Sequence, residues 1–369
     1  MLIRDTNIKV DRDRCIACGI CVDRCIMDNL RLSVSPCRQV CPLHINCQGF
    51  IRLLAQGKDQ EAFEVLEEYL PFMSLLSLLC HAPCEKVCAR KKVDRPVQIR
   101  DLYGYLFDQK LELSQIEEGI SKNKKVAILG SGPAALMAEW CLKRSGYDVT
   151  LLERTEEIGG SLRIHMAESQ NHHKTIQTLL DTIIATGVEI KTNIGTFDYN
   201  ATCDLYDAVV ITHQSDGDLS RLKEQNRLDA KRLQPDQITF QSADNKKIFI
   251  CKEFSEELRL VNALANGKTI FESVKRFLTG VPLGWERGFW EAQGNEKSYM
   301  APFEKAKHVR LKNKQLSDIG TREEVLQEAE RCLGCGRPFD ANQTCWYCLP
   351  CEIDCPHSAI EVQIPFLLR

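Results

Sequence analysis

The fold is decided by two stretches, Cys15-Ile-Ala-Cys18-Gly-Ile-Cys21-Val-Asp-Arg-Cys25 and Cys345-Trp-Tyr-Cys348-Leu-Pro-Cys351-Glu-Ile-Asp-Cys355. Both have the spacing C-x2-C-x2-C-x3-C, although one lies near the start of the sequence and the other near its end. Three thiolates this close together can hold three corners of one [4Fe–4S] cube, while the fourth cysteine reaches another cube. Zinc is the alternative, but structural zinc usually takes well-separated pairs of ligands in a closed tetrahedron. We therefore expect iron–sulfur chemistry, with the intervening residues as its scaffold.

The composition is that of a globular protein with room for two or three domains. The chain has 369 residues, 44% hydrophobic and 27% charged. Its formal net charge of −3 gives no reason to expect nucleic acid or an anionic membrane surface as a partner. No apolar run approaches the ~18 residues that a membrane span needs. The 19 cysteines cluster in metal spacings and the start is not a signal peptide, so we expect a reducing cytoplasm and anaerobic metabolism rather than a disulfide framework.

Residues 37–120 carry further cysteines in a helical context. Cys37-Arg-Gln-Val-Cys41-Pro is followed by Cys47, and a second compact group contains Cys80, Cys84 and Cys88. Between these groups, apolar residues near helical spacing predict two helices over 49–70, separated by Gly57.

This arrangement resembles the N-terminal iron–sulfur domain of the glutamate synthase small subunit family. The resemblance rests on the order C-x3-C-P, a two-helix spacer, C-x3-C-E-x2-C and then Pro96-Val-Gln-Ile-Arg100, and it runs from about residue 37 to about residue 336. The family includes many NAD(P)H-linked flavoprotein electron-transfer subunits. The resemblance therefore implies an FAD and iron–sulfur oxidoreductase.

Residues 124–163 carry a dinucleotide-binding pattern. A strand over 125–129 leads into Gly130-Ser-Gly132-Pro133-Ala134-Ala135, a helix follows, and a second strand over 148–152 ends at Glu153. Gly130 permits the tight turn, Gly132 lets the backbone approach a pyrophosphate, and Glu153 would accept hydrogen bonds from ribose hydroxyls. The segment over 156–163, with Gly160 and Arg163, resembles the glycine pair of two-domain flavoproteins, which implies FAD rather than NAD. The alternative is a Rossmann fold kept only as a scaffold.

The second nucleotide domain of the family has no counterpart in this sequence. An NADPH domain with its own fingerprint would be inserted after the strand expected over 206–212, but residues 213–245 are polar and too few. The FAD domain resumes at Ile248, and residues 261–274 resemble its closing helix. The family's Gly-Asp pair, whose Asp binds the ribityl chain, is replaced by Cys251-Lys-Glu253. Glu253 could substitute with a longer reach, and weak or absent flavin is an open alternative.

The cysteine count connects the two ends of the chain. Cys141, Cys203 and Cys251 fall in the nucleotide fold at no ligand spacing and are expected to be ordinary thiols. Near the C-terminus, Cys332-Leu-Gly-Cys335-Gly resembles the EAxRCLxCG element of many relatives. The predicted cluster ligands are ten N-terminal cysteines (Cys15, Cys18, Cys21, Cys25, Cys37, Cys41, Cys47, Cys80, Cys84, Cys88) and six C-terminal ones (Cys332, Cys335, Cys345, Cys348, Cys351, Cys355).

Sixteen thiolates suit four cubes, and since neither ten nor six is a multiple of four, at least one cluster should draw on both ends. A two-cluster ferredoxin exchanges the fourth ligand between its runs. We expect Cys355 to join the cube of the first run, and Cys25 to join the cube of the second. The alternative is that each run closes its own cluster.

The sequence thus predicts an α/β protein in which a Rossmann-like FAD-binding domain is flanked by a helical iron–sulfur domain and a ferredoxin-like module built from both chain ends. The expected boundaries are 1–36 and 332–369 for the two ferredoxin-like halves, 37–120 for the helical domain, 121–280 for the FAD domain, and 281–331 for a linker and helix. Residues 280–320 contain scattered aromatic side chains, including Trp285 and Tyr299, that would pack on the FAD domain or face a partner.

The predicted function is that of an electron-transfer subunit in an anaerobic oxidoreductase complex. Electrons would pass through about four [4Fe–4S] clusters and FAD, between a catalytic partner subunit and a ferredoxin or other acceptor. No residue is predicted to be catalytic, because no catalytic motif is present. Family analogy implies a tungsten- or molybdenum-pterin oxidoreductase as the partner. The alternatives are an NAD(P)H-dependent flavoprotein reductase and a pure iron–sulfur relay with an empty nucleotide fold.

Overall fold

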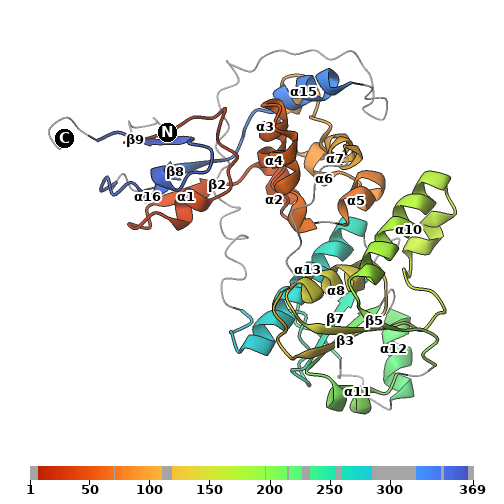
Figure 1. Ribbon diagram of the computed structural model, residues 1–369. Coiled ribbons are helices and arrows are strands. Elements are labelled where there is room, and N and C mark those ends of the chain that lie inside the picture. Colours follow the sequence, from red (N-terminus) through yellow and green to blue (C-terminus); the bar gives the residue numbers. More distant parts are fainter. Residues whose placement is uncertain are drawn as a thin grey trace. The chain divides into compact units, whose positions relative to one another are not determined.

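The computed structural model describes residues 7–69, 71–109, 119–195, 197–213, 216–226, 233–253, 259–284, 321–341 and 345–364. The chain separates into two compact units, one formed by residues 1–73, 82–113 and 291–369, the other by residues 74–81 and 114–290 (Figure 1).

The first unit gathers segments from both halves of the sequence. Its helices and strands are β1 (Ile8–Val10), α1 (Ile20–Asp23), β2 (Leu30–Ser33), α2 (Pro36–Val40), α3 (Cys47–Ala55), α4 (Asp59–Glu64), the 3-10 helix η1 (Glu67–Tyr69), α6 (Pro83–Lys86), the 3-10 helix η2 (Ala89–Lys92), α7 (Ile99–Asp108), α15 (Arg322–Glu330), β8 (Arg337–Asp340), α16 (Pro350–Ile353) and β9 (Ile360–Val362).

Two antiparallel strand pairs join the chain ends in this unit. Strand β1 pairs with β9 and β2 pairs with β8, as Figure 1 shows where red and blue segments lie side by side. Between the pairs lies an apolar cluster that includes Leu30, Ile360 and Val362, together with Cys21 and Cys351. Each half is too small to bury such a core alone, so the halves complete one another. The prediction of a ferredoxin-like module built from both ends is confirmed.

The helical part of the first unit forms around α3. Its residues Phe50, Leu53 and Leu54 are buried at helical spacing, and α3 packs against α4, α7 and α15. The ring of Phe50 lies 4.9 Å from that of Tyr103, which is on α7. Gly57 has a φ of 73°, a left-handed conformation that ends α3 before α4 begins, as the sequence predicted.

The second unit is a doubly covered parallel sheet. Its elements are α5 (Met73–Leu79), β3 (Lys125–Leu129), α8 (Pro133–Arg144), β4 (Asp148–Leu152), α9 (Leu162–Met166), α10 (Gln170–Ala185), β5 (Glu189–Lys191), α11 (Tyr199–Leu205), β6 (Ala208–His213), α12 (Asp216–Gln225), β7 (Ile248–Lys252) and α13 (Leu260–Thr279). The strands run parallel in the order β5-β4-β3-β6-β7.

The sheet has a helical layer on each face, as a Rossmann-like fold requires. Helices α8 and α13 pack against each other over β3, β6 and β7, with the rings of Phe249 and Phe277 at 5.9 Å. On the opposite face, Val209 and Ile250 join Cys203 of α11 and Leu222 of α12 in one apolar cluster. Only residues 214–247 separate β6 from β7, so the sheet continues directly where the family would insert its NADPH domain.

The structure describes residues 280–284 of the segment over 280–320. The aromatic residues predicted to pack on the FAD domain or face a partner begin at Trp285 and lie outside the described residues. Among the helices that the structure describes, none is long and apolar enough to cross a membrane.

Candidate functional site

The two cysteine runs have the same backbone conformation. Three pairs of residues at equivalent positions share a positive φ: Ala17 and Tyr347 (52° and 56°), Gly19 and Leu349 (97° and 71°), Asp28 and Ser358 (48° and 47°). Only one of these six is glycine, so the loops hold L-residues in a region that such residues seldom adopt. Four residues after the last cysteine of each run, a backbone N–H donates to its sulfur, at 3.4 Å for Cys25 and 3.3 Å for Cys355. The runs are therefore structural repeats.

The repeats are joined crosswise. Desolvation is the largest cause that raises the pKa of the Cys21 thiol to about 12, and the neighbouring thiolates of Cys18, Cys15, Cys355 and Cys351 contribute to the same rise. Burial likewise raises the pKa of Cys15, with Cys18 and Cys355 as nearby charges.

The second repeat has the reciprocal neighbours. Burial raises the pKa of Cys351 to about 11, with Cys25, Cys345 and Cys348 as the nearby charges. Helices α1 and α16 pack together, and an ion pair of 3.0 Å joins Arg24 to Asp354, the residues just before the fourth cysteines. Each run thus lies beside the fourth cysteine of the other.

A second group of thiols lies in the helical part of the first unit. Cys37 and Cys47 share a hydrogen bond, which lowers the pKa of Cys37 to about 7 and raises the pKa of Cys47 well above its usual value. Cys84 also hydrogen-bonds Cys47, and the Tyr103 hydroxyl lies 3.2 Å from the Cys47 sulfur. These buried thiols need a positive partner before they can ionise together.

The C-terminal pair Cys332 and Cys335 lies in the same neighbourhood. Burial raises the pKa of Cys332 to about 12 and raises the pKa of Cys335 well above its usual value, and Cys37 and Cys88 are among the charges near both. This pair therefore lies beside the N-terminal helical part, and its sharing of clusters with that part stays a prediction. Cys80, in the second unit, is buried.

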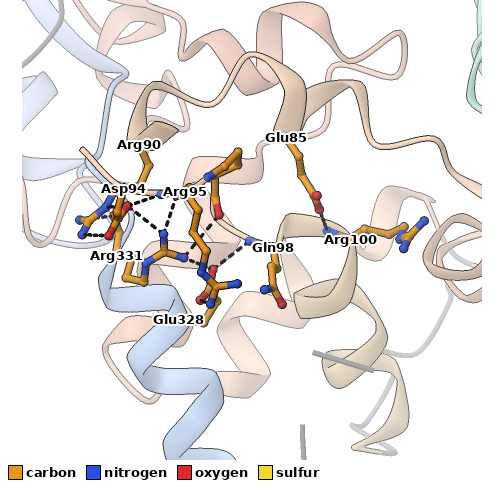
Figure 2. Close-up of polar contacts among 9 residues, drawn as sticks. Glu85, Arg90, Asp94, Arg95, Gln98, Arg100, Glu328 and Arg331 are labelled. Carbon is orange, nitrogen blue, oxygen red and sulfur yellow. Dashed lines mark hydrogen bonds and ion pairs between the residues drawn. The ribbon is translucent and has the colours of Figure 1, made fainter. Parts of the chain in front are cut away.

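A buried ion network holds this C-terminal pair in place (Figure 2). Arg331, which precedes Cys332 and has no exposed surface, pairs with Asp94 at 3.0 Å and with Glu328 at 2.5 Å. Arg90 holds the same Asp94 at 2.7 Å and donates to the Arg331 carbonyl at 3.1 Å. Hydrogen bonds from Arg90 and Arg331 hold the pKa of Asp94 far below its usual range.

The other end of the network reaches the start of α7. Glu328 is fully buried and accepts the backbone N–H of Gln98 at 2.9 Å, while Arg95 pairs with it at 3.3 Å. The sequence shows Arg331 and Glu328 only as members of a charged helix, so sequence reasoning missed their role.

A second anchor lies just beyond Cys335. The Gln48 amide donates to the Gly336 carbonyl at 2.6 Å and accepts the Gly336 N–H at 2.6 Å. A Cβ at Gly336 would lie 2.7 Å from the Gln48 oxygen and 2.8 Å from the Ser33 carbonyl, so only glycine fits there.

Within the described residues, no group of three or more His, Cys, Asp or Glu side chains is arranged to hold a single metal ion. A cubane differs in that its thiolates are shared among several iron atoms. The grouped, desolvated thiols fit such a cluster in residue type and neighbourhood.

The nucleotide fold of the second unit contains a cavity of about 580 Å³ at the carboxyl ends of its strands. Its size is within the usual range for small-molecule and cofactor sites. Five of the predicted cofactor-binding residues line it, namely Gly130, Gly132, Glu153, Gly160 and Arg163.

The predicted adenosine side of the cavity has its polar groups internally paired. Glu153 accepts hydrogen bonds from Ser131 at 2.5 Å and from the Thr155 backbone at 2.9 Å. Arg163 pairs with Glu157 at 2.6 Å and donates to the Ile158 carbonyl at 2.7 Å.

The predicted pyrophosphate position is taken by a side chain of the protein itself. Glu253, 3% exposed, accepts the N–H groups of Ala134 and Ala135, each at 2.9 Å. A Cβ added to Gly132 would lie 2.6 Å from that carboxylate. The cavity is large enough for part of a dinucleotide, but with Glu253 in this position the helix N-terminus does not fit a pyrophosphate.

Comparisons with known proteins match two segments of the chain. Residues 2–115 match the family model "Dihydropyrimidine dehydrogenase domain II, 4Fe-4S cluster". Residues 128–182 match "NAD(P)-binding Rossmann-like domain". The chain thus contains a 4Fe–4S domain and a Rossmann-like nucleotide-binding domain.

Relatives among curated proteins are subunits of oxidoreductases. The chain is 31% identical over 168 residues to "NADPH-Fe(3+) oxidoreductase subunit beta" of Geobacter sulfurreducens, covering 44% of this chain and 25% of that protein. It is 28% identical over 183 residues to "NADP(+)-dependent formate dehydrogenase subunit beta" of Moorella thermoacetica, covering 43% and 26%. "Glutamate synthase [NADPH] small chain" of Mycobacterium tuberculosis is 27% identical over 191 residues, covering 51% and 36%. The matches thus span between a quarter and about a third of these relatives' lengths.

Proposed function

We propose, from the chain's membership of the family of FAD and iron–sulfur oxidoreductases that includes the glutamate synthase small subunit, that it is an electron-transfer subunit of an oxidoreductase complex. The observation that carries the proposal is the crosswise placement of the two cysteine repeats. A pair of loops with eight thiols, each loop beside the other's fourth cysteine, is the arrangement that two adjacent [4Fe–4S] clusters require. The clusters would supply the one-electron chemistry, and the protein would fix their spacing and surroundings.

Four clusters account for the thiols. In the ferredoxin-like module, Cys15, Cys18, Cys21 and Cys355 would hold one cube, and Cys345, Cys348, Cys351 and Cys25 another. In the helical part, Cys37, Cys88, Cys332 and Cys335 would hold a third, because burial raises the pKa of both C-terminal thiols and Cys37 and Cys88 are charges near both. Cys41, Cys47 and Cys84 remain for a fourth cube, since all three are charges near Tyr103. Cys80, the last of the sixteen thiols, remains a ligand predicted from the sequence alone.

FAD has no step in this proposal. The family implies it, and the cavity is large enough for part of it. Its pyrophosphate would have to enter where Glu253 already accepts the N–H groups of Ala134 and Ala135. The proposed relay therefore runs through the clusters alone, and FAD remains a prediction from the sequence.

A catalytic oxidoreductase subunit is the proposed partner. The relative named as a subunit of a formate dehydrogenase supports a partner of this general kind. A tungsten- or molybdenum-pterin enzyme is the partner that the family resemblance implies. A ferredoxin is the proposed small acceptor, because the ferredoxin-like module places Cys18 and Cys348 at exposed positions from which an electron can leave.

The test is anaerobic reduction of the isolated chain. Dithionite should bleach the cluster absorbance and give the electron-spin resonance of reduced [4Fe–4S] centres, with roughly 16 iron atoms per chain if four cubes are present. NADH and NADPH alone should not bleach it, because residues 214–247 leave no room for a nicotinamide domain. Rapid bleaching by either nucleotide would instead support the NAD(P)H-dependent reductase.

A further inference from the structure

We propose that Glu253 is an internal anion that excludes phosphate from the nucleotide fold. It occupies the place that a dinucleotide pyrophosphate takes in this fold, so the cavity accepts an uncharged nucleoside or flavin moiety in preference to its phosphorylated forms. The proposal concerns the second unit only and does not depend on the iron–sulfur relay.

The backbone N–H donors in the first turn of α8 are all in use. Pro133, the first helical residue, has no N–H. The next two N–H groups, of Ala134 and Ala135, both donate to the Glu253 carboxylate, one to each oxygen. The Leu136 N–H donates to the Gly132 carbonyl at 2.9 Å, which is the first bond within the helix. No donor of this turn is left for a phosphate oxygen while Glu253 stays in place.

The backbone holds Glu253 in this position. Glu253 follows β7 directly, and its N–H donates to the His213 carbonyl at the end of β6 at 2.7 Å. Because parallel strands end at one edge of the sheet, the residue after β7 lies beside the turn that follows β3. Gly132 leaves the space that the carboxylate fills, since a Cβ there would lie 2.6 Å from it.

Charge strengthens the exclusion. A carboxylate at a helix N-terminus satisfies the same donors and the same positive dipole end as a phosphate does. A pyrophosphate that entered beside Glu253 would be repelled by the buried negative charge of the carboxylate. Its oxygens would also find no free N–H donor in the first turn of α8, so both effects disfavour binding.

The first test needs no variant. Adenosine and ADP are titrated separately into the purified full-length chain and followed by calorimetry. The wild type should bind ADP no more tightly than adenosine, because the phosphates gain no donors. ADP binding that is tenfold tighter than adenosine binding would overturn the proposal.

The second test removes the Glu253 carboxylate from the N-terminus of α8. Glu253→Ala should bind FAD and ADP at least tenfold more tightly than the wild type, and Glu253→Gln should show a smaller gain because its amide still fills part of the space. The matched control is Glu156→Gln, which removes the same charge from an exposed position lining the same cavity.

An equal gain in the control would assign the effect to general electrostatics and overturn the proposal. Folding of each variant is checked by thermal denaturation, and Glu253→Gln, which keeps the shape, covers the case in which Glu253→Ala fails to fold. Folded variants that bind FAD and ADP no better than the wild type would also overturn it.

Discussion

Glu139 is a buried carboxyl group whose protonation should be visible in the stability of the protein. It lies on α8 with no exposed surface, and burial raises its pKa from 4.5 to about 8, although the Thr186 hydroxyl donates to it at 2.9 Å. Since the folded state holds the proton more tightly than the unfolded state, unfolding releases a proton between these two values. The contribution of protonated Glu139 to the free energy of unfolding is therefore complete below about pH 4.5 and is lost as the pH rises to about 8.

The prediction is that the melting temperature falls between about pH 5 and pH 8, whereas Glu139→Gln flattens that dependence. The variant should gain up to a few kcal/mol over the wild type at pH 8 and little at pH 5. Thermal denaturation followed by circular dichroism at both pH values measures this. Parallel pH profiles for the two proteins would contradict a buried, neutral Glu139.

Helix α15 ends just before Cys332 and Cys335, the predicted C-terminal pair of ligands. Arg331 and Glu328 face into the first unit and are fully buried, while Arg322 at the start of the same helix makes an exposed ion pair of 3.1 Å with Asp59. Removing one partner of a buried ion pair lowers the free energy of unfolding by several kcal/mol, because the remaining charge is then buried without a partner or water. Exposed pairs contribute only ~0–1 kcal/mol.

We therefore expect Arg331→Met to destabilise the protein by about 3 kcal/mol and to lower its iron content by about one cluster. Arg322→Met is the control in the same helix and should change stability by less than about 1 kcal/mol, with full iron content. Iron analysis and thermal denaturation of both variants decide this. Normal iron in folded Arg331→Met would show that the network does not position Cys332 and Cys335.

At the scale of the whole molecule, the first unit depends on contact between segments more than 300 residues apart. The register Ile8 to Val362 and Leu30 to Asp340 brings both chain ends into one module. Asn7 adds a side-chain hydrogen bond of 2.8 Å to the Tyr347 hydroxyl. The two cysteine runs are thus neighbours because of strand pairing, and each can supply a ligand to the other's cluster.

Paired cysteine substitutions can show which ligands share a cube. Under crosswise ligation, Cys15→Ala with Cys355→Ala should damage one cluster and leave about 12 of roughly 16 iron atoms, whereas Cys15→Ala with Cys25→Ala should alter two clusters. Local ligation predicts the reverse for the two double variants. Iron content and electron-spin resonance of both proteins, purified anaerobically, distinguish the two arrangements.

The amino-acid sequence by itself determined the local features of this protein. The strands over 125–129 and 148–152 lie at the predicted residues, and so does the break at Gly57, because side-chain periodicity and glycine conformation act over a few residues. The cysteine spacings indicated iron–sulfur chemistry for the same reason, since three ligands lie in each short loop.

Only the tertiary structure decided which distant groups meet. Arg331 looks like a surface residue of a charged helix, and it is buried because Asp94, far away in the chain, lies beside it. The sequence leaves open whether Glu253 contacts a flavin, but the common edge of a parallel sheet places it against the N-terminus of α8, where it accepts two backbone N–H groups. Such pairings depend on how strands and helices pack, and a buried charge takes whichever partner packing brings within reach.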